Sequence, residues 1–211
     1  MPRALDGSTI CAISTASGAG GIAVVRVSGP DALAFSSAIF SKPLTSDSDR
    51  RVVFGRILSD GAIIDEGLAL VLCGPGSYTG EDTVEYNIHG STFIQAEVVQ
   101  LLILAGCRHA GPGEFTQRAF LNGRLDLTQA EAVADLIAAE HSGAHRLAVD
   151  QLRGNFSREI GALRSSLIEF AGLLELELDF SEEDLEFADR TRFQDLLTKL
   201  LTRVTSLADS F

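Results

Sequence analysis

Several features that would narrow the function quickly are missing from this chain of 211 residues. Its three cysteines, Cys11, Cys73 and Cys107, are too few and too scattered for a disulfide scaffold or a CxxC metal site. Their apolar neighbours indicate buried thiols in a reducing compartment. No run reaches the roughly 18 apolar residues of a membrane span, and the N-terminus lacks the pattern of a signal peptide. We therefore expect a cytoplasmic protein that does not enter the membrane.

Basic residues are also scarce. The chain has 17 Lys and Arg against 29 Asp and Glu, which gives a formal net charge of −12 at pH 7. Phosphate backbones and anionic membranes are bound by basic surface, so this balance argues against a general nucleic-acid binder, although it allows a local basic pocket. Apolar residues at 45% and charged residues at 22% are ordinary for a globular chain with a real core.

Nucleotide-binding motifs are absent as well. The Walker pattern GxxxxGK[ST] occurs nowhere in the chain, and the glycine-rich segment 17–21 does not fit the dinucleotide pattern GxGxxG. The residues after this segment predict a strand, and not the helix N-terminus that would bind a phosphate. We interpret these glycines as a turn, and we do not expect the chain as given to hydrolyse GTP.

The composition changes near residue 120. Fifteen of the 20 glycines and all five prolines precede residue 119, in a region where short apolar runs alternate with turns. The later residues are rich in Leu and Ala, lack proline, and carry 17 acids against nine bases. We predict an α+β domain over residues 1–120 and an all-α helical bundle over residues 121–211.

Periodicity predicts the elements of both domains. In the first domain, strands are predicted at 9–14, 22–28, 51–58, 66–72 and 83–88, and helices at 30–40, 91–104 and 112–121. Asp60-Gly61 predicts a hairpin turn between two of these strands. In the second domain, Thr128 and Glu131 form a T-x-x-E capping-box pattern that predicts a helix start. Apolar spacing then predicts one long helix over 144–178 and another from about residue 189.

Two charged residues interrupt strands that otherwise favour burial. The guanidinium of Arg26 must be paired or must face a pocket that holds an anion or a polar ligand, unless it points to solvent from an edge strand. Alternation places Val84 and Tyr86 on one face of a later strand and Glu85 on the other. Glu85 either faces solvent or accepts two N–H donors from a flat heterocycle.

The segment that joins the two domains is a further candidate. Residues 113–127 place polar side chains among aromatic ones, and junctions between domains are favoured ligand sites. Arg118 and Arg124 either contribute to such a site or form salt bridges with Glu114 and Asp126.

No catalytic set and no metal site can be assigned from the sequence. His141 and His145 have the i, i+4 spacing of metal ligands, but the intervening Ser-Gly favours a helix end. The acidic residues between 175 and 189 are interpreted as solvated helix ends or, alternatively, as a docking surface for a basic partner.

Four stretches together resemble one family. They are TASGAGGIAVVRVSG (15–29), GPGSYTGEDTVEYNIHG (74–90), GPGEFTQRAFLNGRLDLTQAEAVADLI (111–137) and LELELDFSEED (174–184). In order and spacing they are similar to the MnmE (TrmE) family of tRNA-modifying GTPases. The resemblance implies an N-terminal domain like the folate-binding aminomethyltransferases, which binds 5-formyl- or 5,10-methylenetetrahydrofolate and forms a homodimer. It also implies a helical domain that follows, with a GTPase domain inserted into it.

The resemblance implies folate contacts at Arg26, Glu85 and Arg124. Our hypothesis is that Glu85 faces the N–H groups of the pterin, while the two arginines hold anionic or carbonyl groups. With the flavin- and NADH-using partner MnmG, family members form an aminomethyl-type modification at the wobble uridine of tRNAs. GTP, Mg²⁺ and K⁺ are expected only in the GTPase domain, which is absent from the chain as given. The alternative is a dimerisation and partner-docking scaffold with a vestigial folate pocket.

Overall fold

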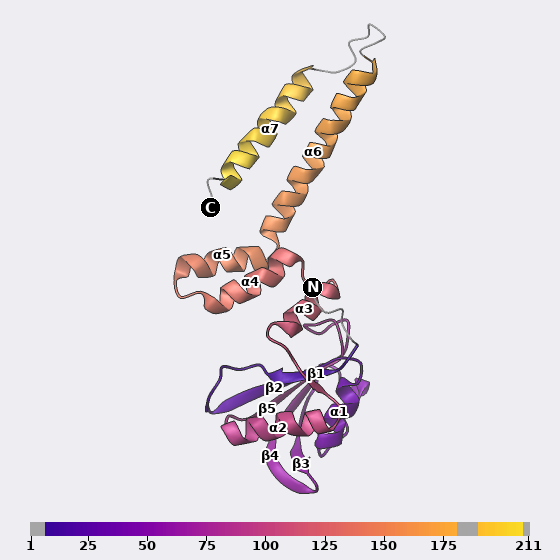
Figure 1. The fold of residues 1–211 in the computed structure, drawn as a ribbon, viewed down its shortest axis with the longest axis vertical. Coiled ribbons are helices and arrows are strands. Elements are labelled where there is room, and N and C mark those ends of the chain that lie inside the picture. The colour runs from indigo at the N-terminus through magenta and orange to yellow at the C-terminus, as the bar shows by residue number, and fades with distance from the viewer. Residues whose placement is uncertain (1–6, 181–189, 209–211) are drawn as a thin grey trace. The chain divides into compact units, whose positions relative to one another are not determined.

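The computed structural model describes residues 7–180 and 190–208, and the chain divides into two compact units, residues 1–130 and 131–211. In the first unit the described strands form one six-stranded sheet in the order β3-β4-β5-β2-β1-β6 (Figure 1). Their bounds are β1 Ile10–Ile13, β2 Ile22–Ser28, β3 Val52–Ser59, β4 Ala62–Leu72, β5 Thr83–His89 and β6 Arg108–His109. Neighbouring strands are antiparallel except β1 and β6, which are parallel.

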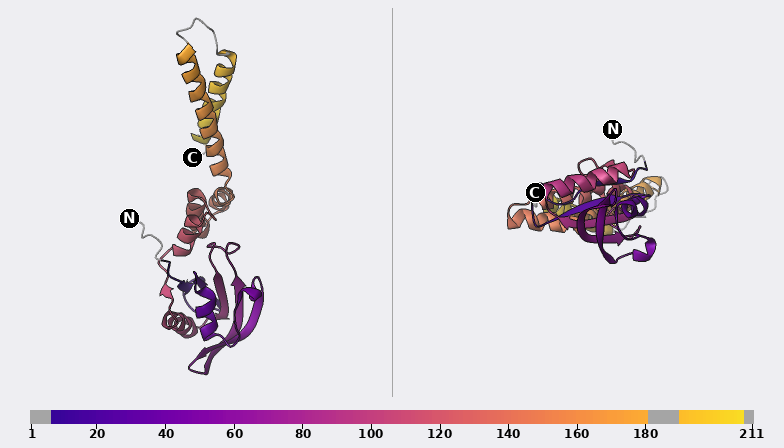
Figure 2. Two further views of the ribbon diagram at one scale, coloured as in Figure 1. Left: turned by 90° about the vertical axis from the view of Figure 1, so that its right-hand side faces the viewer. Right: turned by 90° about the horizontal axis from the view of Figure 1, so that it is seen from below.

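Two helices, α1 (Ala32–Ile39) and α2 (Thr92–Leu104), cover one face of this sheet (Figure 2). Alternate residues of β2 and β5, Tyr86 among them, are buried in the core that these helices share with the sheet. The intervening residues, which include Arg26 and Glu85, lie on the opposite face because side chains alternate along a strand. The predicted α+β architecture of this domain is confirmed.

The predicted strands agree closely with the observed ones. β2 has the predicted bounds, and the ends of β1, β3 and β5 differ by one residue, whereas β4 begins four residues earlier than predicted. Asp60 and Gly61 form the turn between β3 and β4, with φ of 47° and 84°. β6 was not predicted, because its two residues are too few to show any periodicity.

The remainder of the described chain is helical, as predicted. The helices are α3 Glu114–Leu121, α4 Leu127–Ala138, α5 Ser142–Leu152, α6 Asn155–Phe180 and α7 Arg190–Ala208. In the second unit α6 packs against both α5 and α7. The division between the two compact units lies within α4.

The N-terminus of α4 is capped by Asp126 and Gln129. The backbone N–H of Gln129 donates to Asp126 Oδ1 (2.8 Å), and the backbone N–H of Asp126 donates to Gln129 Oε1 (2.9 Å). This reciprocal pair is a capping box with aspartate at the N-cap. The predicted capping box at Thr128 and Glu131 is therefore wrong by two residues. Asp126 and Gln129 have the same i, i+3 spacing, so spacing alone does not distinguish the two pairs.

The predicted long helix over 144–178 is also wrong, because it is interrupted between α5 and α6. The interruption is at Gly154, whose φ is 71°, a left-handed conformation that glycine adopts without steric cost. The N–H of Gly154 donates to the carbonyl of Gln151 (2.8 Å), which closes the end of α5. The apolar spacing continues across this interruption, so periodicity alone does not reveal it.

Candidate functional site

An arginine and a glutamate form an ion pair on the face of the sheet opposite α1 and α2. Arg26 on β2 and Glu85 on β5 are direct cross-strand neighbours, and Arg26 Nε lies 2.8 Å from Glu85 Oε1. The two side chains are 22% and 20% exposed, so both can be reached from solvent. Since β2 lies between β5 and β1 inside the sheet, the edge-strand interpretation of Arg26 is wrong and the paired one is confirmed.

Two aromatic rings lie against the guanidinium of Arg26. Its Cζ is 5.1 Å from the centre of the Tyr78 ring and 5.4 Å from the centre of the Phe115 ring. Tyr78 belongs to the loop between β4 and β5, and Phe115 belongs to the first turn of α3. Both distances fall within the range of cation–π contacts, so the rings restrict how the guanidinium can turn.

This arrangement leaves hydrogen-bonding capacity for a ligand. No described residue forms a hydrogen bond with the Nη atoms of Arg26 or with Oε2 of Glu85. A guanidinium offers a planar fork of donors, whereas a carboxylate accepts N–H groups. Beside two aromatic rings, this set of groups suits a flat ligand that carries both acceptors and N–H donors.

The loop 74–82, which carries Tyr78, is fixed to α3 and to the turn that follows it. The hydroxyl of Tyr78 and Thr116 Oγ1 are hydrogen-bonded at 2.9 Å. Asn122 Nδ2 donates to the carbonyl of Thr79 at 2.8 Å. These bonds hold the tyrosine ring next to the ion pair.

Arg124 lies beside the same loop but outside the ion pair. Its stem is close to Gly80, where an added Cβ would lie 3.2 Å from Arg124 Cγ. No described residue, Asp126 included, forms a salt bridge with its exposed guanidinium, so the salt-bridge interpretation of Arg124 is wrong. The structure thus brings the first two predicted residues into contact and places the third against the loop between β4 and β5.

Arg118 is fully buried within a network of charges. Its Nη1 lies 3.2 and 3.1 Å from the two carboxylate oxygens of Glu81, and its Nη2 lies 3.1 Å from Glu114 Oε1. Arg108 Nη1 donates to the other oxygen of Glu114 at 2.9 Å, and Ser28 Oγ donates to Glu81 at 2.8 Å. The network joins α3 to β6, to β2 and to the loop 74–82. The predicted pair of Arg118 with Glu114 is confirmed, but the role of Glu81 was not predicted.

Glu114 remains ionised in this network. Hydrogen bonds from Arg108, from the backbone N–H of Gly111 and from Arg118 lower the pKa of its carboxyl from 4.5 to about 2, although burial acts in the opposite direction. Arg108 has the largest effect. The four charged groups of the network, two arginines and two glutamates, therefore balance one another.

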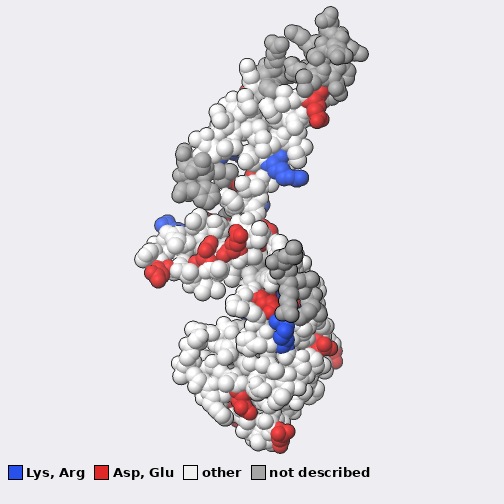
Figure 3. Space-filling model, viewed as in Figure 1, with Lys and Arg blue, Asp and Glu red and all other residues white. Residues whose placement is uncertain are grey.

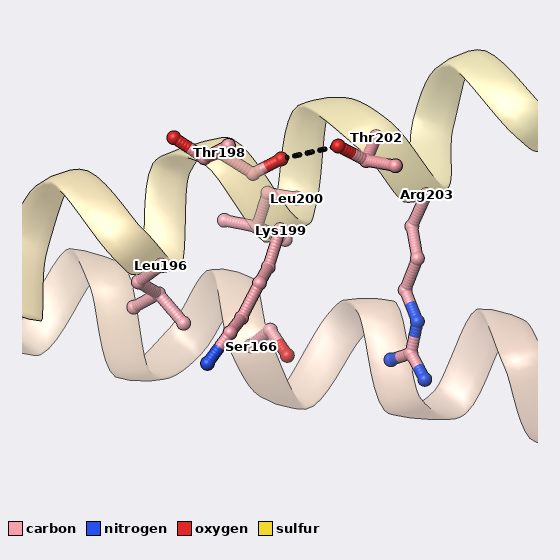
Figure 4. A pocket seen from close by; sticks show the side chains of 7 residues that line it. All are labelled: Ser166, Leu196, Thr198, Lys199, Leu200, Thr202 and Arg203. Carbon is pink, nitrogen blue, oxygen red and sulfur yellow. Dashed lines mark hydrogen bonds between the residues drawn. The ribbon is translucent and has the colours of Figure 1, made fainter.

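The helical unit contains a groove of about 450 Å³ between α6 and α7 (Figure 4). Leucine, lysine and arginine side chains of α7 line it together with serine and threonine residues. The hydroxyls of Ser166, Thr198 and Thr202 donate to carbonyls of their own helices. No paired acid and base lines the groove, so it is not a candidate active site.

The structure also bears on the remaining sequence candidates. His141 precedes α5 in an extended conformation, so it shares no helical face with His145. Within residues 7–180 and 190–208, no cluster of His, Cys, Asp and Glu could hold a metal ion. No described helix is long and apolar enough to cross a membrane. Beyond Glu175, the side chains of the acidic stretch that ends at residue 189 lie outside the described residues.

Comparison with known proteins assigns the chain to a family. Residues 9–124 match the family described as the N-terminus of the GTP-binding protein TrmE, and residues 127–211 match the MnmE helical domain. The chain belongs to the MnmE (TrmE) family. This confirms the resemblance noted in the sequence, and it assigns the site around Arg26 and Glu85 to the TrmE N-terminal domain.

Individual MnmE relatives support the assignment. The tRNA modification GTPase MnmE of Flavobacterium johnsoniae is 51% identical over 211 residues, covering 98% of this chain and 45% of the relative. That of Parabacteroides distasonis is 53% identical over 211 residues, covering 97% of this chain and 46% of the relative. The chain therefore spans about half the length of the curated MnmE relatives that it matches.

Proposed function

We propose that this chain is the tetrahydrofolate-binding and helical portion of a tRNA modification GTPase. The observation that carries the proposal is the Arg26–Glu85 pair, which leaves donors and an acceptor free beside two aromatic rings in a TrmE N-terminal domain. The pterin of a folate is flat and carries N–H donors and a carbonyl acceptor, and its tail is anionic. A one-carbon tetrahydrofolate, 5-formyl or 5,10-methylene, therefore fits the chemistry of the site.

Each of the three residues has a distinct role in this proposal. Glu85 Oε2 accepts N–H groups of the pterin, and the Nη atoms of Arg26 donate to its carbonyl. Because these two side chains are already bonded to each other, they act as one unit, and loss of either disturbs the other. Arg124, exposed beside Gly80, binds an anionic group of the folate.

For the activity of the whole protein, support comes from the relatives, which are named tRNA modification GTPase MnmE. We propose that the full-length protein is a cytoplasmic homodimer that hydrolyses GTP with Mg²⁺ and K⁺ in a domain outside this chain. With MnmG, it forms the aminomethyl-type modification at the wobble uridine of tRNAs.

Binding of tRNA is assigned to the complex, and not to this piece alone. The formal net charge of the chain is −12. On the face drawn in Figure 3, the basic groups of the described residues form no continuous stripe on either unit. A phosphate backbone needs such basic surface.

A second candidate function is a scaffold that dimerises and docks a partner. It is favoured by the ion pair itself, because Arg26 and Glu85 bind each other directly across β2 and β5, with Nε 2.8 Å from Oε1. On this view the pair stabilises the sheet, and the folate pocket is vestigial.

Calorimetric titration with 5-formyltetrahydrofolate separates the two functions. Arg26→Ala and Glu85→Ala should each weaken binding by about tenfold or more, because a hydrogen bond to a charged group contributes about 1.5–3 kcal/mol. Matched controls are Arg56→Ala and Glu66→Ala, which remove another cross-strand pair with an Nε–Oε1 distance of 2.7 Å on β3 and β4. The controls should bind normally.

Absence of binding by both the folded chain and the full-length protein would support the scaffold. Binding only by the full-length protein would instead indicate that residues outside this chain complete the pocket.

A further inference from the structure

We propose that Arg118 is a positioning residue of this pocket, which fixes the loop 74–82 on α3 and so holds Tyr78 and Phe115 against Arg26. The inference deepens the proposed folate site and rests on it. Arg118 is fully buried, so it acts through the residues that it holds and not by contact with a ligand.

The connectivity of the site supports this role. Phe115 and Arg118 are three residues apart on α3, and Glu81 follows Tyr78 by three residues in the loop. The two contacts between Arg118 Nη1 and the carboxylate of Glu81, at 3.2 and 3.1 Å, therefore join the two segments that supply the aromatic rings. The bond between Tyr78 and Thr116 joins the same segments at a second point.

The chemistry of the network requires an arginine at this position. Glu81 and Glu114 come from different elements, and one planar guanidinium binds both carboxylates at once. Lysine has a single ammonium group and lacks this fork. Without Arg118, the carboxylate of Glu81 would lose its charge partner in a partly buried place, which favours separation of the loop from α3.

The buried Nε of Arg118 indicates that this residue does more than fill space in the core. Arg118 Nε is buried and has no hydrogen-bond partner. An unsatisfied buried donor is costly, and an apolar side chain would avoid that cost. The arginine is therefore explained by the two carboxylates that its Nη atoms hold, which lie on the two segments that carry the aromatic rings.

The tyrosine content of the chain provides a direct readout. There is no tryptophan, and the two tyrosines are Tyr78 in the site and Tyr86 in the core. Tyr86 is fully buried and donates its hydroxyl proton to the carbonyl of Ser36 at 2.7 Å. A chain labelled with 3-fluorotyrosine should therefore give two ¹⁹F resonances, one that reports on the pocket and one on the core. Tyr78→Phe assigns them.

The test is Arg118→Lys, with Arg56→Lys as the control at an exposed ion pair. We expect Arg118→Lys to shift the Tyr78 resonance, to leave the Tyr86 resonance in place, and to weaken binding of 5-formyltetrahydrofolate by about tenfold. Arg56→Lys should change neither the two tyrosine resonances nor the binding of 5-formyltetrahydrofolate. If Arg118→Lys does not fold, Glu81→Gln tests the same link, because it removes the charge partner at nearly constant shape. It should shift the Tyr78 resonance alone.

Two results would overturn the inference. An unmoved Tyr78 resonance in the folded variants would show that Arg118 does not position the loop. Equal shifts of both resonances would show that Arg118 supports the whole domain and not this site. If neither the wild-type chain nor the full-length protein binds folate but Arg118→Lys still moves the Tyr78 resonance alone, the proposed function fails while the positioning role stands.

Discussion

The two compact units of this chain differ in how much of their apolar surface they bury. In the sheet unit, strands and helices share one core whose central residues, such as Val25 and Leu102, are fully buried. In the described part of the helical unit, only Ala132, Ala148 and Leu200 are buried apolar residues. Its helices expose large side chains, as in Ile137 at 82% and Leu201 at 68%.

This difference indicates where a preorganised site can lie. The side chains of the Arg26 site are held by bonds within the sheet unit, from β2, β5, α3 and the loop 74–82. The helical unit instead presents apolar stripes that a bundle normally buries. We infer that the sheet unit holds its site unaided, whereas the helical unit offers surface for further packing.

The largest expected effect is on the free energy of unfolding, when a large apolar side chain is truncated in each unit. Leu102→Ala should lower the free energy of unfolding by about 3 kcal/mol, because the substitution leaves a cavity in a packed core. Leu201→Ala removes the same atoms from an exposed position and should change it by less than about 0.5 kcal/mol. Urea unfolding of the whole chain measures both. Equal effects would contradict the contrast between the two units.

The next effect is a pH dependence confined to the sheet unit. The pKa of Glu114 is lowered from 4.5 to about 2, so its ion pairs stabilise the folded state above about pH 4.5. This contribution decreases as the pH falls from 4.5 towards 2. Glu114→Gln should therefore lower stability by about 2 kcal/mol at pH 7. The difference from wild type should shrink across that window, and a difference independent of pH would contradict the role of Glu114.

The smallest expected effects come from removing a single hydroxyl group, in one variant from the site and in the other from the core. Tyr78→Phe removes the bond to Thr116 and should weaken folate binding about fivefold, since a hydrogen bond contributes about 1 kcal/mol. Tyr86→Phe removes a bond to the carbonyl of Ser36 and should lower stability by about 1 kcal/mol. Its folate affinity should not change. An equal loss of affinity in both variants would contradict the assignment of Tyr78 to the site.

Local pattern was enough to predict much of the sheet unit. β2 was predicted with its observed bounds, and alternation correctly placed Val84 and Tyr86 on one face of β5 and Glu85 on the other. Arg26 was recognised as unusual because a charge within an apolar strand requires a partner. Its partner on β5 could not be identified, since strand order depends on contacts between residues distant in the chain.

Two further features were not predicted, one because it depends on a long-range contact and the other because it is a local turn of the backbone. Glu81 and Arg118 are far apart in the chain, and nothing in the local sequence distinguishes Glu81 from a solvent-exposed loop carboxylate. Their ion pair forms only because the fold places α3 beside the loop. The end of α5 was missed because Gly154 interrupts the backbone without interrupting the apolar spacing. Helical periodicity reports which residues share a face, and it does not report where the backbone turns.

Hydrogen exchange with and without 5-formyltetrahydrofolate tests most directly whether the folate site belongs to the sheet unit alone. We predict slower exchange in β2, β5, α3 and the loop 74–82 when the ligand is present, and no change in α6 or α7. Protection that appears mainly in α6 and α7, or in no segment at saturating ligand, would contradict this assignment.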